Sequence, residues 1–141
     1  MAKSKIIAIL AILIFGSRLL AFSQKPTDLV LKTLSPVTFG KASWYSTEAC
    51  KYNPDPKCPT ASGESLYALE KQGERFAASY DYPLGTALQV TNRCNGRSVL
   101  VHVFDRGPNR RLGRVLDLSK KAFKEIAELK EGIINIKVEV L

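Results

Sequence analysis

Two loop segments, each with a single carboxylate, hold the residues best suited to chemistry in this chain. Asp105 opens the segment Asp105–Arg111, D-R-G-P-N-R-R, where one carboxylate stands among three arginines. Glu64 ends the turn Pro59–Glu64, P-T-A-S-G-E, which consists mainly of small residues. A carboxyl group beside a bound substrate can donate or accept a proton in general acid–base catalysis. The alternative is structural: Asp105 pairs with Arg106 or another nearby arginine and fixes its loop, and Glu64 is an exposed turn acid.

Short strands broken by turns begin at residue 37 and must position both loops. The strands are predicted over residues 37–45, 87–92, 98–105, 114–118 and 134–140, the last from a clean alternation of apolar and polar residues. Ser119 is placed to cap a helix that Gly132 ends. Many short strands, Gly/Pro-rich turns and one short helix near the C-terminus predict an all-β fold, a closed or nearly closed barrel.

The strand that leads to Asp105 determines where its carboxylate points. Asn95–Gly96 predicts a type I′ hairpin turn before this strand, because both residues tolerate positive φ angles. The alternating valines of Val99–Val103 share one face, and Asp105 keeps their parity. We therefore expect the Asp105 side chain to point toward the barrel side of the strand. The single histidine, His102, falls on the other face and is interpreted as a surface or packing residue.

Residues 1–23 are typical of a Sec-type signal peptide. Two lysines precede an apolar run over residues 6–15, and the small residues Ala21 and Ser23 suit cleavage before Gln24. A bilayer span needs roughly 20 apolar residues, about twice this run, although an uncleaved tether is an open alternative. We expect export to the periplasm or the medium and association with the cell wall. The chain then divides into the signal peptide, a leader over residues 24–36 and one domain over residues 37–141.

The net charge and the positions of the cysteines limit the classes of partner that are expected. Cleavage of the signal peptide would remove three basic residues and lower the formal net charge from +8 to +5, which suits an anionic envelope polymer. No aromatic–basic cluster of the kind that grips nucleic acid is present in the sequence, so no nucleic acid partner is expected. No lipid anchor is expected either, since the first cysteine, Cys50, is far from the cleavage point.

The cysteines are interpreted as structural, and neither a metal nor a cofactor is expected. Cys50 and Cys58 stand at the ends of a short loop that a disulfide could close, which would leave Cys94 over. Cys94 could instead pair with either of the other two cysteines.

A series of ordered motifs resembles the rare lipoprotein A family. The motifs are Gly40–Tyr45 (G-K-A-S-W-Y), Thr60–Glu64 (T-A-S-G-E), Pro83–Thr86 (P-L-G-T), Val90–Asn92 with Asn95–Val99 (V-T-N and N-G-R-S-V), Asp105–Pro108 (D-R-G-P) and Arg114–Ser119 (R-V-L-D-L-S). The matches extend over nearly all of residues 40–141. The resemblance implies a six-stranded double-psi β-barrel, a fold shared with expansins and barwin-like proteins, and a monomer is expected.

The characterised enzymes of that family are lytic transglycosylases that cleave the glycan strands of peptidoglycan. The resemblance implies that Asp105 is the general acid/base, which protonates the oxygen between N-acetylmuramic acid and N-acetylglucosamine. It then accepts the proton of the muramyl 6-hydroxyl, which closes on the anomeric carbon to give a 1,6-anhydro sugar. One catalytic carboxylate suffices here, whereas hydrolysis generally uses two. Glu64 matches the family's second functional acid and would position the sugar or support the oxocarbenium-like centre.

The chain departs from the family pattern at Ser79, where a histidine is usual in T-A-A-H-x-x-L-P-L-G-T. Ser79 and Asp81 are candidates for hydrogen bonds to a sugar, although Asp81 also suits a structural turn. The arginines of residues 106–114 line a groove for an anionic glycan or form a solvated loop, and Arg106 is the favoured ligand among them. Tyr45 is a candidate for stacking on a sugar, whereas the neighbouring tryptophan is expected in the core. The missing histidine favours the alternative function, a non-catalytic expansin-like module that binds cell-wall polysaccharide.

Overall fold

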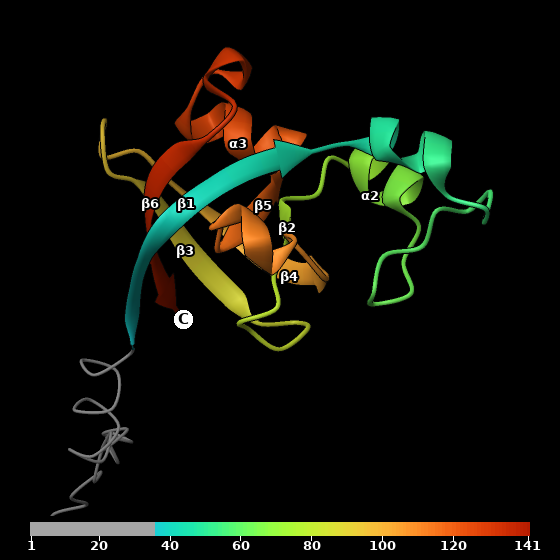
Figure 1. Ribbon diagram of the computed structural model, residues 1–141, viewed down its shortest axis with the longest axis horizontal. Helices are drawn as coiled ribbons and strands as arrows, with labels where there is room; N and C mark the ends of the chain where they lie inside the picture. The colour runs from blue at the N-terminus through green and yellow to red at the C-terminus, as the bar shows by residue number, and fades with distance from the viewer. Residues whose placement is uncertain (1–35) are drawn as a thin grey trace, which may run out of the picture.

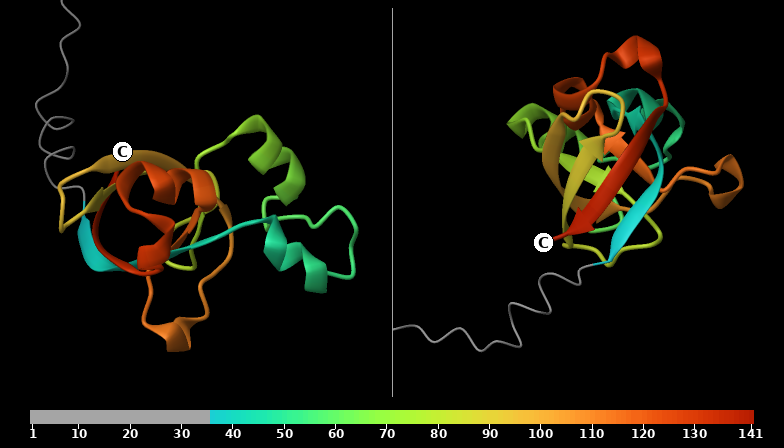
Figure 2. Two further views of the ribbon diagram at one scale, coloured as in Figure 1. Left: turned by 90° about the horizontal axis from the view of Figure 1, so that it is seen from above. Right: turned by 90° about the vertical axis from the view of Figure 1, so that its left-hand side faces the viewer.

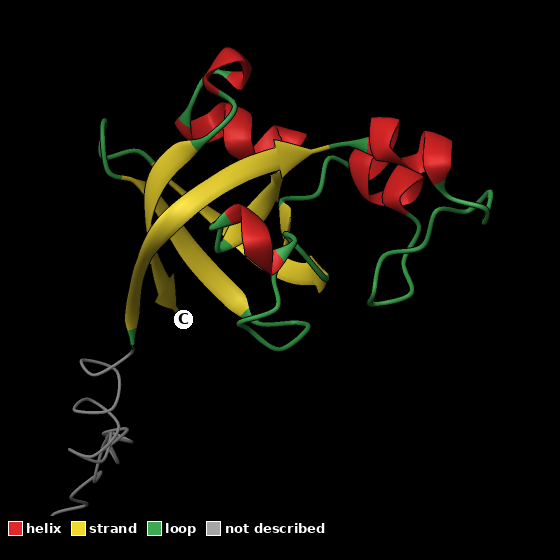
Figure 3. Cartoon of the chain, in the orientation of Figure 1, coloured by secondary structure: helices red, strands yellow, loops and turns green. Residues whose placement is uncertain are grey.

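Six strands close into a barrel, and Figures 1 and 3 show their arrangement. The computed structural model describes residues 36–141. The strands are β1 (Val37–Tyr45), β2 (Phe76–Ala78), β3 (Ala87–Asn92), β4 (Ser98–Asp105), β5 (Leu116–Ser119) and β6 (Ile134–Val140). They are hydrogen-bonded in the order β1-β5-β2-β4-β3-β6, and β6 closes onto β1. The pairs β1–β5 and β2–β4 are parallel, and the remaining pairs are antiparallel. The predicted six-stranded closed barrel is confirmed.

The barrel interior is filled by alternate side chains of the strands, because successive side chains point to opposite faces. Val101 and Val103 of β4 are fully buried and meet Leu88 and Val90 of β3 in the same core. The helix α3 (Lys120–Ile126) adds Phe123 and Ile126 to this core. Trp44, expected in the core, is partly buried and packs against it, and its indole N–H donates to the Leu129 carbonyl at 3.1 Å.

Two predicted boundaries are corrected. β5 begins at Leu116 rather than at residue 114. Ser119 caps α3 as predicted, since its Oγ accepts the N–H of Ala122 at 3.3 Å. The helix ends at Ile126, however, because Ala127 adopts an extended backbone. Gly132 instead ends the separate 3₁₀ turn Leu129–Glu131.

The turn between β3 and β4 also differs from the prediction. Asn92 N donates to Arg97 O at 2.9 Å and Gly96 N donates to Asn92 O at 2.8 Å, so the loop is longer than the two residues of a type I′ hairpin. Gly96 has a positive φ of 73°, but Asn95 does not. Asn95 uses its side chain instead, accepting the Arg97 N–H and donating to the Ile126 carbonyl. These side-chain bonds make a wider loop stable without a type I′ backbone.

Residues 46–75 form a small helical arm that projects from the barrel (Figures 1 and 2). The arm contains the 3₁₀ helix η1 (Thr47–Tyr52) and the helix α2 (Leu66–Gln72), which was not predicted. Cys50 and Cys58 are joined by a disulfide, and Cys94 is free and exposed, which resolves the alternatives. The arm has its own apolar cluster, which packs on the outer side of the barrel: Cys50, Cys58, Leu66, Leu69, Phe76, Tyr45 and Phe104.

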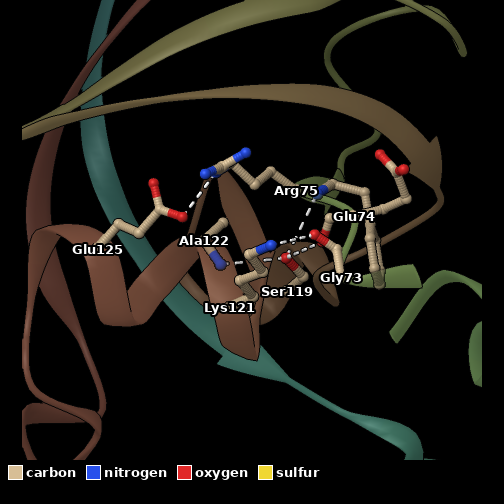
Figure 4. Close-up of polar contacts among 8 residues, drawn as sticks. Gly73, Glu74, Arg75, Ser119, Lys121, Ala122 and Glu125 are labelled. Carbon is tan, nitrogen blue, oxygen red and sulfur yellow. Dashed lines mark hydrogen bonds and ion pairs between the residues drawn. The ribbon is translucent and has the colours of Figure 1, made fainter. Parts of the chain in front are cut away.

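The point where the arm re-enters the barrel is tied to α3, as Figure 4 shows. Ser119 Oγ accepts the N–H of Phe76 at 3.3 Å and donates to the Glu74 carbonyl at 3.4 Å. Lys121 Nζ donates to the Gly73 carbonyl at 2.6 Å, and Arg75 pairs with Glu125 at 2.6 Å. These contacts fix the arm relative to the strands that carry the candidate site.

The N-terminal predictions lie outside the described residues. The signal peptide over residues 1–23 and the leader up to residue 35 are therefore not described by the structure. Within residues 36–141, no helix has the length and apolar character needed to cross a membrane.

Candidate active site

Asp105 is the last residue of β4 and lies on the outer face of the barrel, because the ladder with β2 contains an irregularity. Ala77 pairs with Val103, but Ala78 pairs with Asp105, so the register shifts at Phe104. Such a bulge turns the following side chain to the other face. Ala78 alternates with Ala77, which belongs to the barrel core, so Ala78 and its partner Asp105 face outward. The expectation that Asp105 points toward the barrel side is wrong, since parity holds only along a regular strand.

The two oxygens of the Asp105 carboxylate have different surroundings. Oδ1 accepts backbone N–H groups from Ala61 at 2.9 Å and from Arg106 at 2.8 Å. Oδ2 accepts a long bond of 3.4 Å from the Tyr45 hydroxyl. Because two amides hold Oδ1, the carboxylate is oriented while Oδ2 keeps capacity for a further partner.

Tyr45, at the end of β1, is directed at Asp105 rather than presented to solvent as a free ring. Its ring packs edge-on against Phe76, with centroids 5.7 Å apart. Burial raises the pKa of the Tyr45 phenol well above its ordinary value, and the negative charge of Asp105 and the hydrogen bond to it act in the same direction. Tyr45 is therefore a neutral donor to Asp105.

The loop that carries Glu64 is docked directly beside Asp105. Its ends are joined by an isolated bridge between Pro59 and Ser65, and Thr60 donates from both N and Oγ1 to the Glu64 carbonyl, at 2.8 and 3.0 Å. Ser62 N donates to the Phe104 carbonyl at 2.9 Å, which attaches the loop to β4 next to Asp105. The Glu64 side chain is exposed, and within residues 36–141 it takes part in no hydrogen bond or ion pair. The structure thus brings together the two segments that carry Asp105 and Glu64, and the Glu64 carboxylate is exposed to solvent.

Ser79, a predicted sugar ligand, lies inside the protein. It is fully buried, its Oγ donates to the Val115 carbonyl at 3.2 Å, and the same Oγ accepts the Asp81 N–H at 3.1 Å. A direct hydrogen bond from Ser79 to a sugar is therefore not available in this structure. Asp81 is exposed and pairs with Arg110 at 3.2 Å.

Arg106 fixes the backbone around Ser79. Its Nη1 donates to the carbonyls of Ser79 at 2.8 Å and Tyr82 at 2.7 Å. These two carbonyls bracket the residues between them, so the guanidinium, predicted as a substrate ligand, holds the loop that follows β2 in one conformation.

A second carboxylate on the same outer face was not assigned a role from the sequence. Asp117 of β5 pairs with Ala78 on one side and with Ser43 of β1 on the other, one strand away from Asp105. Ser43 Oγ donates to Asp117 Oδ1. Arg114 Nε lies 3.4 Å from the same oxygen, a charge contact without hydrogen-bond geometry, and is otherwise unpartnered within residues 36–141. The alternation of Leu116 and Leu118 into the core is the sequence signal that could have placed Asp117 outside.

Comparison with known proteins places this arrangement in a family. Residues 37–138 match the family model described as lytic transglycolase. The probable endolytic peptidoglycan transglycosylase RlpA of Aquifex aeolicus is 42% identical over 102 residues, which cover 72% of this chain and 40% of that protein. The endolytic peptidoglycan transglycosylase RlpA of Vibrio cholerae is 35% identical over 104 residues, covering 72% and 35%. The chain thus spans less than half the length of these two relatives.

This chain is also similar to the solved structure of an expansin. The expansin of Clavibacter michiganensis is 25% identical with a TM-score of 0.55, covering 75% of this chain and 50% of that one. The family match covers every strand of the barrel except the end of β6, and the ordered motifs fall within it. The resemblance noted in the sequence is thereby confirmed, and the chain belongs to the RlpA-like lytic transglycolase family, whose fold is the double-psi β-barrel.

Proposed function

We propose that this chain is an endolytic lytic transglycosylase that cleaves peptidoglycan glycan strands between N-acetylmuramic acid and N-acetylglucosamine. The observation that carries this proposal is the Asp105 carboxylate, which two backbone amides hold through Oδ1 while Oδ2 keeps capacity for a substrate. The family match and the names of the relatives support the reaction class.

In this mechanism Asp105 serves first as acid and then as base. Protonated Asp105 gives its proton to the glycosidic oxygen, and the bond from that oxygen to the muramyl anomeric carbon breaks. The carboxylate then takes the proton of the muramyl 6-hydroxyl as its oxygen bonds to the anomeric carbon. The proton returns to Asp105, the N-acetylglucosamine end leaves with a hydroxyl, and the other end becomes a 1,6-anhydro sugar without water as a reactant.

Glu64 is proposed as the second acid of the site. Its loop contacts β4 through Ala61 and Ser62, and its side chain is free to meet a glycan laid across Asp105. A carboxylate there would stabilise positive charge at the anomeric carbon. Tyr45 is proposed to position Asp105, and Arg106 and Asp81 to fix the neighbouring loop, with sugar contacts limited to their exposed atoms.

We further propose that the protein is exported through its N-terminal 23 residues and works as a monomer at the cell wall without a lipid anchor. The layout of residues 1–23 and the peptidoglycan named for the relatives support this location.

Digestion of purified peptidoglycan tests the activity. The full chain is produced by export, and products from walls with and without stem peptides are read by mass spectrometry for 1,6-anhydromuramyl ends. We expect these ends from the wild type and a loss of at least about 100-fold in Asp105→Asn, the scale of general acid–base catalysis. The amide oxygen introduced by this substitution can still accept the two backbone N–H groups, so the variant should keep its fold.

A non-catalytic module that binds wall polysaccharide is the second candidate. Two observations favour it: Ser79 stands in the place of the family histidine, and the fold resembles an expansin. Sedimentation with insoluble peptidoglycan separates the candidates. Equal binding by wild type and Asp105→Asn, with no anhydro ends from either, would replace the enzyme by the binding module.

A further inference from the structure

A shallow groove beside the candidate active site has residues that the proposed reaction does not use. It is lined by Tyr80, Gly107, Pro108, Asn109, Asp117 and the arginines at 106, 110 and 111. The lining contains three arginines and one aspartate and is therefore positive. It begins at Arg106, the neighbour of Asp105, and reaches Asp117, which lies one strand away from Asp105. A glycan bound across Asp105 would extend into it.

Tyr80 presents an aromatic ring in this groove, and its position is held from several sides. Arg106 binds the carbonyls of Ser79 and Tyr82, which flank it. The Arg110 guanidinium lies 5.3 Å from the centre of the Tyr80 ring and is itself held by Asp81. The residue is nevertheless 50% exposed. A fixed, half-exposed ring loses little conformational entropy on binding, which suits it to stack on a sugar.

Arg111 supplies a charge that the described part of the chain leaves unpaired. Its backbone N–H is bound by Asn109 Oδ1 at 3.0 Å, which fixes the start of the 3₁₀ turn Arg110–Leu112. Within residues 36–141 its guanidinium takes part in no ion pair or hydrogen bond, whereas Arg110 is paired with Asp81 and Arg114 with Asp117. Arg111 is therefore the arginine of the groove most open to an anion.

We propose that Tyr80 and Arg111 form a subsite for a muramic acid residue next to the cleaved bond. The Tyr80 ring stacks on the sugar, and Arg111 binds the lactyl carboxylate. This inference rests on the proposed function, since a peptide-free glycan strand carries its negative charge on that carboxylate. It assigns recognition of the substrate's charge to the loop after β4 and recognition of its ring to the loop after β2.

Binding of three soluble probes tests the subsite. The probes are a peptide-free tetrasaccharide of alternating N-acetylglucosamine and N-acetylmuramic acid, the same tetrasaccharide with its carboxylates converted to amides, and chitotetraose, which is neutral. Calorimetry is done with the exported protein carrying Asp105→Asn, so that no probe is turned over. We expect the carboxylate probe to bind tightest, with the amide probe and chitotetraose both weaker by roughly tenfold, the value of one charged hydrogen bond.

Two variants separate the charge from the ring. Arg111→Gln should weaken the carboxylate probe roughly tenfold and leave the other two unchanged, because only the ion pair is lost. Tyr80→Ala should weaken all three probes, and Tyr80→Phe should restore them. Arg97→Gln is the matched control, since Arg97 is an exposed arginine in the turn at the opposite end of β4.

The outcomes decide the inference separately from the enzymatic function. Three outcomes would overturn the subsite. Arg111→Gln could weaken the carboxylate and amide probes equally, or it could weaken neither. The parent protein with Asp105→Asn could also bind none of the three probes. Anhydro-sugar release by the wild type is measured independently. The enzyme can therefore stand while the subsite fails, and the subsite can stand on a chain that only binds glycan.

Discussion

Asp105 is oriented by donors from three separate segments of the chain. Ala61 comes from the arm, Arg106 from the following loop and Tyr45 from the end of β1. A catalytic carboxyl group must be held by its surroundings before substrate arrives, because an unrestrained side chain would spend binding energy on its own ordering. The neutral phenol of Tyr45 is the least expected of these partners, and it gives a measurable consequence.

The raised pKa of Tyr45 predicts a loss of stability at alkaline pH. In the unfolded chain the phenol titrates near its ordinary value of 10.0, whereas the folded protein keeps the proton to higher pH. The stabilisation is complete below pH 10 and is lost as the pH rises above it, by up to about 1.4 kcal/mol per pH unit for one proton. Tyr45→Phe keeps the packing on Phe76 and removes this proton, so its free energy of unfolding should fall less steeply. Urea unfolding at pH 9, 10 and 11 measures the difference.

Tyr52→Phe is the control for that experiment, since Tyr52 is 90% exposed. Its profile should match that of the wild type. A profile of Tyr45→Phe that also matches would contradict the burial of the phenol against Asp105.

Substitution of Asp117 should lower the stability of the fold through a broken ion pair rather than through a change of protonation. Asp117→Ala would leave the Arg114 guanidinium, which is only 20% exposed, without its counter-charge, and would remove the acceptor of Ser43. Breaking a buried pair from one side costs about 3 kcal/mol. Asp81→Ala breaks an exposed pair with Arg110 and should cost less than about 1 kcal/mol. Similar urea midpoints for the two variants would show that the Asp117 contact adds nothing to stability.

The sequence led to two acid-bearing segments that meet in the structure, but it did not give the orientation of every side chain in them. The motif positions of Asp105 and Glu64 led to two segments that do meet. The outward direction of Asp105 follows from the register shift at Phe104, which depends on a partner strand, β2, that no local pattern predicts. The burial of Ser79 likewise depends on Val115, a residue 36 positions away in the chain.

Some of the helices and strands could be predicted from the sequence, and others could not. Strands β3, β4 and β6 alternate in burial along most of their length, and their bounds follow from that pattern. β2 is three residues long, too short for a periodic signal to stand out, and α2 was not predicted although α3, of equal length, was. Both matter to the site, because β2 lies between Asp105 and Asp117, and α2 closes the arm that carries Ala61.

The Cys50–Cys58 disulfide should stabilise both the fold and the position of the arm beside Asp105. The double variant Cys50→Ser/Cys58→Ser, made in a Cys94→Ser background to prevent exchange, removes a short covalent loop. The chain-entropy relation gives a loss of about 2.5 kcal/mol for a loop of this size. A looser arm would also weaken the Ala61 bond to Asp105, so anhydro-sugar release should fall. Thermal unfolding and product analysis are compared with Cys94→Ser alone, and unchanged values in both would separate the arm from the site.

Substitution of Gly40 should create a packing conflict between β1 and the segment before β5. A Cβ built on Gly40 would overlap the Val115 side chain, and Val115 also holds Ser79 through its carbonyl. Gly40→Ala should therefore destabilise the fold by about 1–3 kcal/mol, the usual cost of overpacking. Val115→Ala removes the overlapping methyl groups, so the double variant should recover part of that loss. Additive losses in a double-mutant cycle of urea unfolding would show that the two positions do not meet.

At the scale of the whole molecule, barrel closure joins strands from distant parts of the chain. The closed order of strands leaves no unpaired edge among the described strands, so none of them offers an edge to another chain. The parallel pairs β1–β5 and β2–β4, joined by the antiparallel pair β2–β5, bring residues from four strands into one row: Asp105, Ala78, Asp117 and Ser43. Such pairings join distant parts of the chain, which is why motif order predicted the family more readily than the geometry of the site.

Export is a property of the whole chain and can be tested on its N-terminus. If residues 1–23 are a signal peptide, the exported protein begins at Gln24, and intact mass spectrometry of the periplasmic or secreted fraction finds that N-terminus. Small residues at 21 and 23 are needed by the peptidase, so Ala21→Leu/Ser23→Leu should leave the longer chain in the membrane fraction. A wild type of full mass in that fraction would instead indicate a tethered protein, with its barrel and glycan site held at the membrane surface.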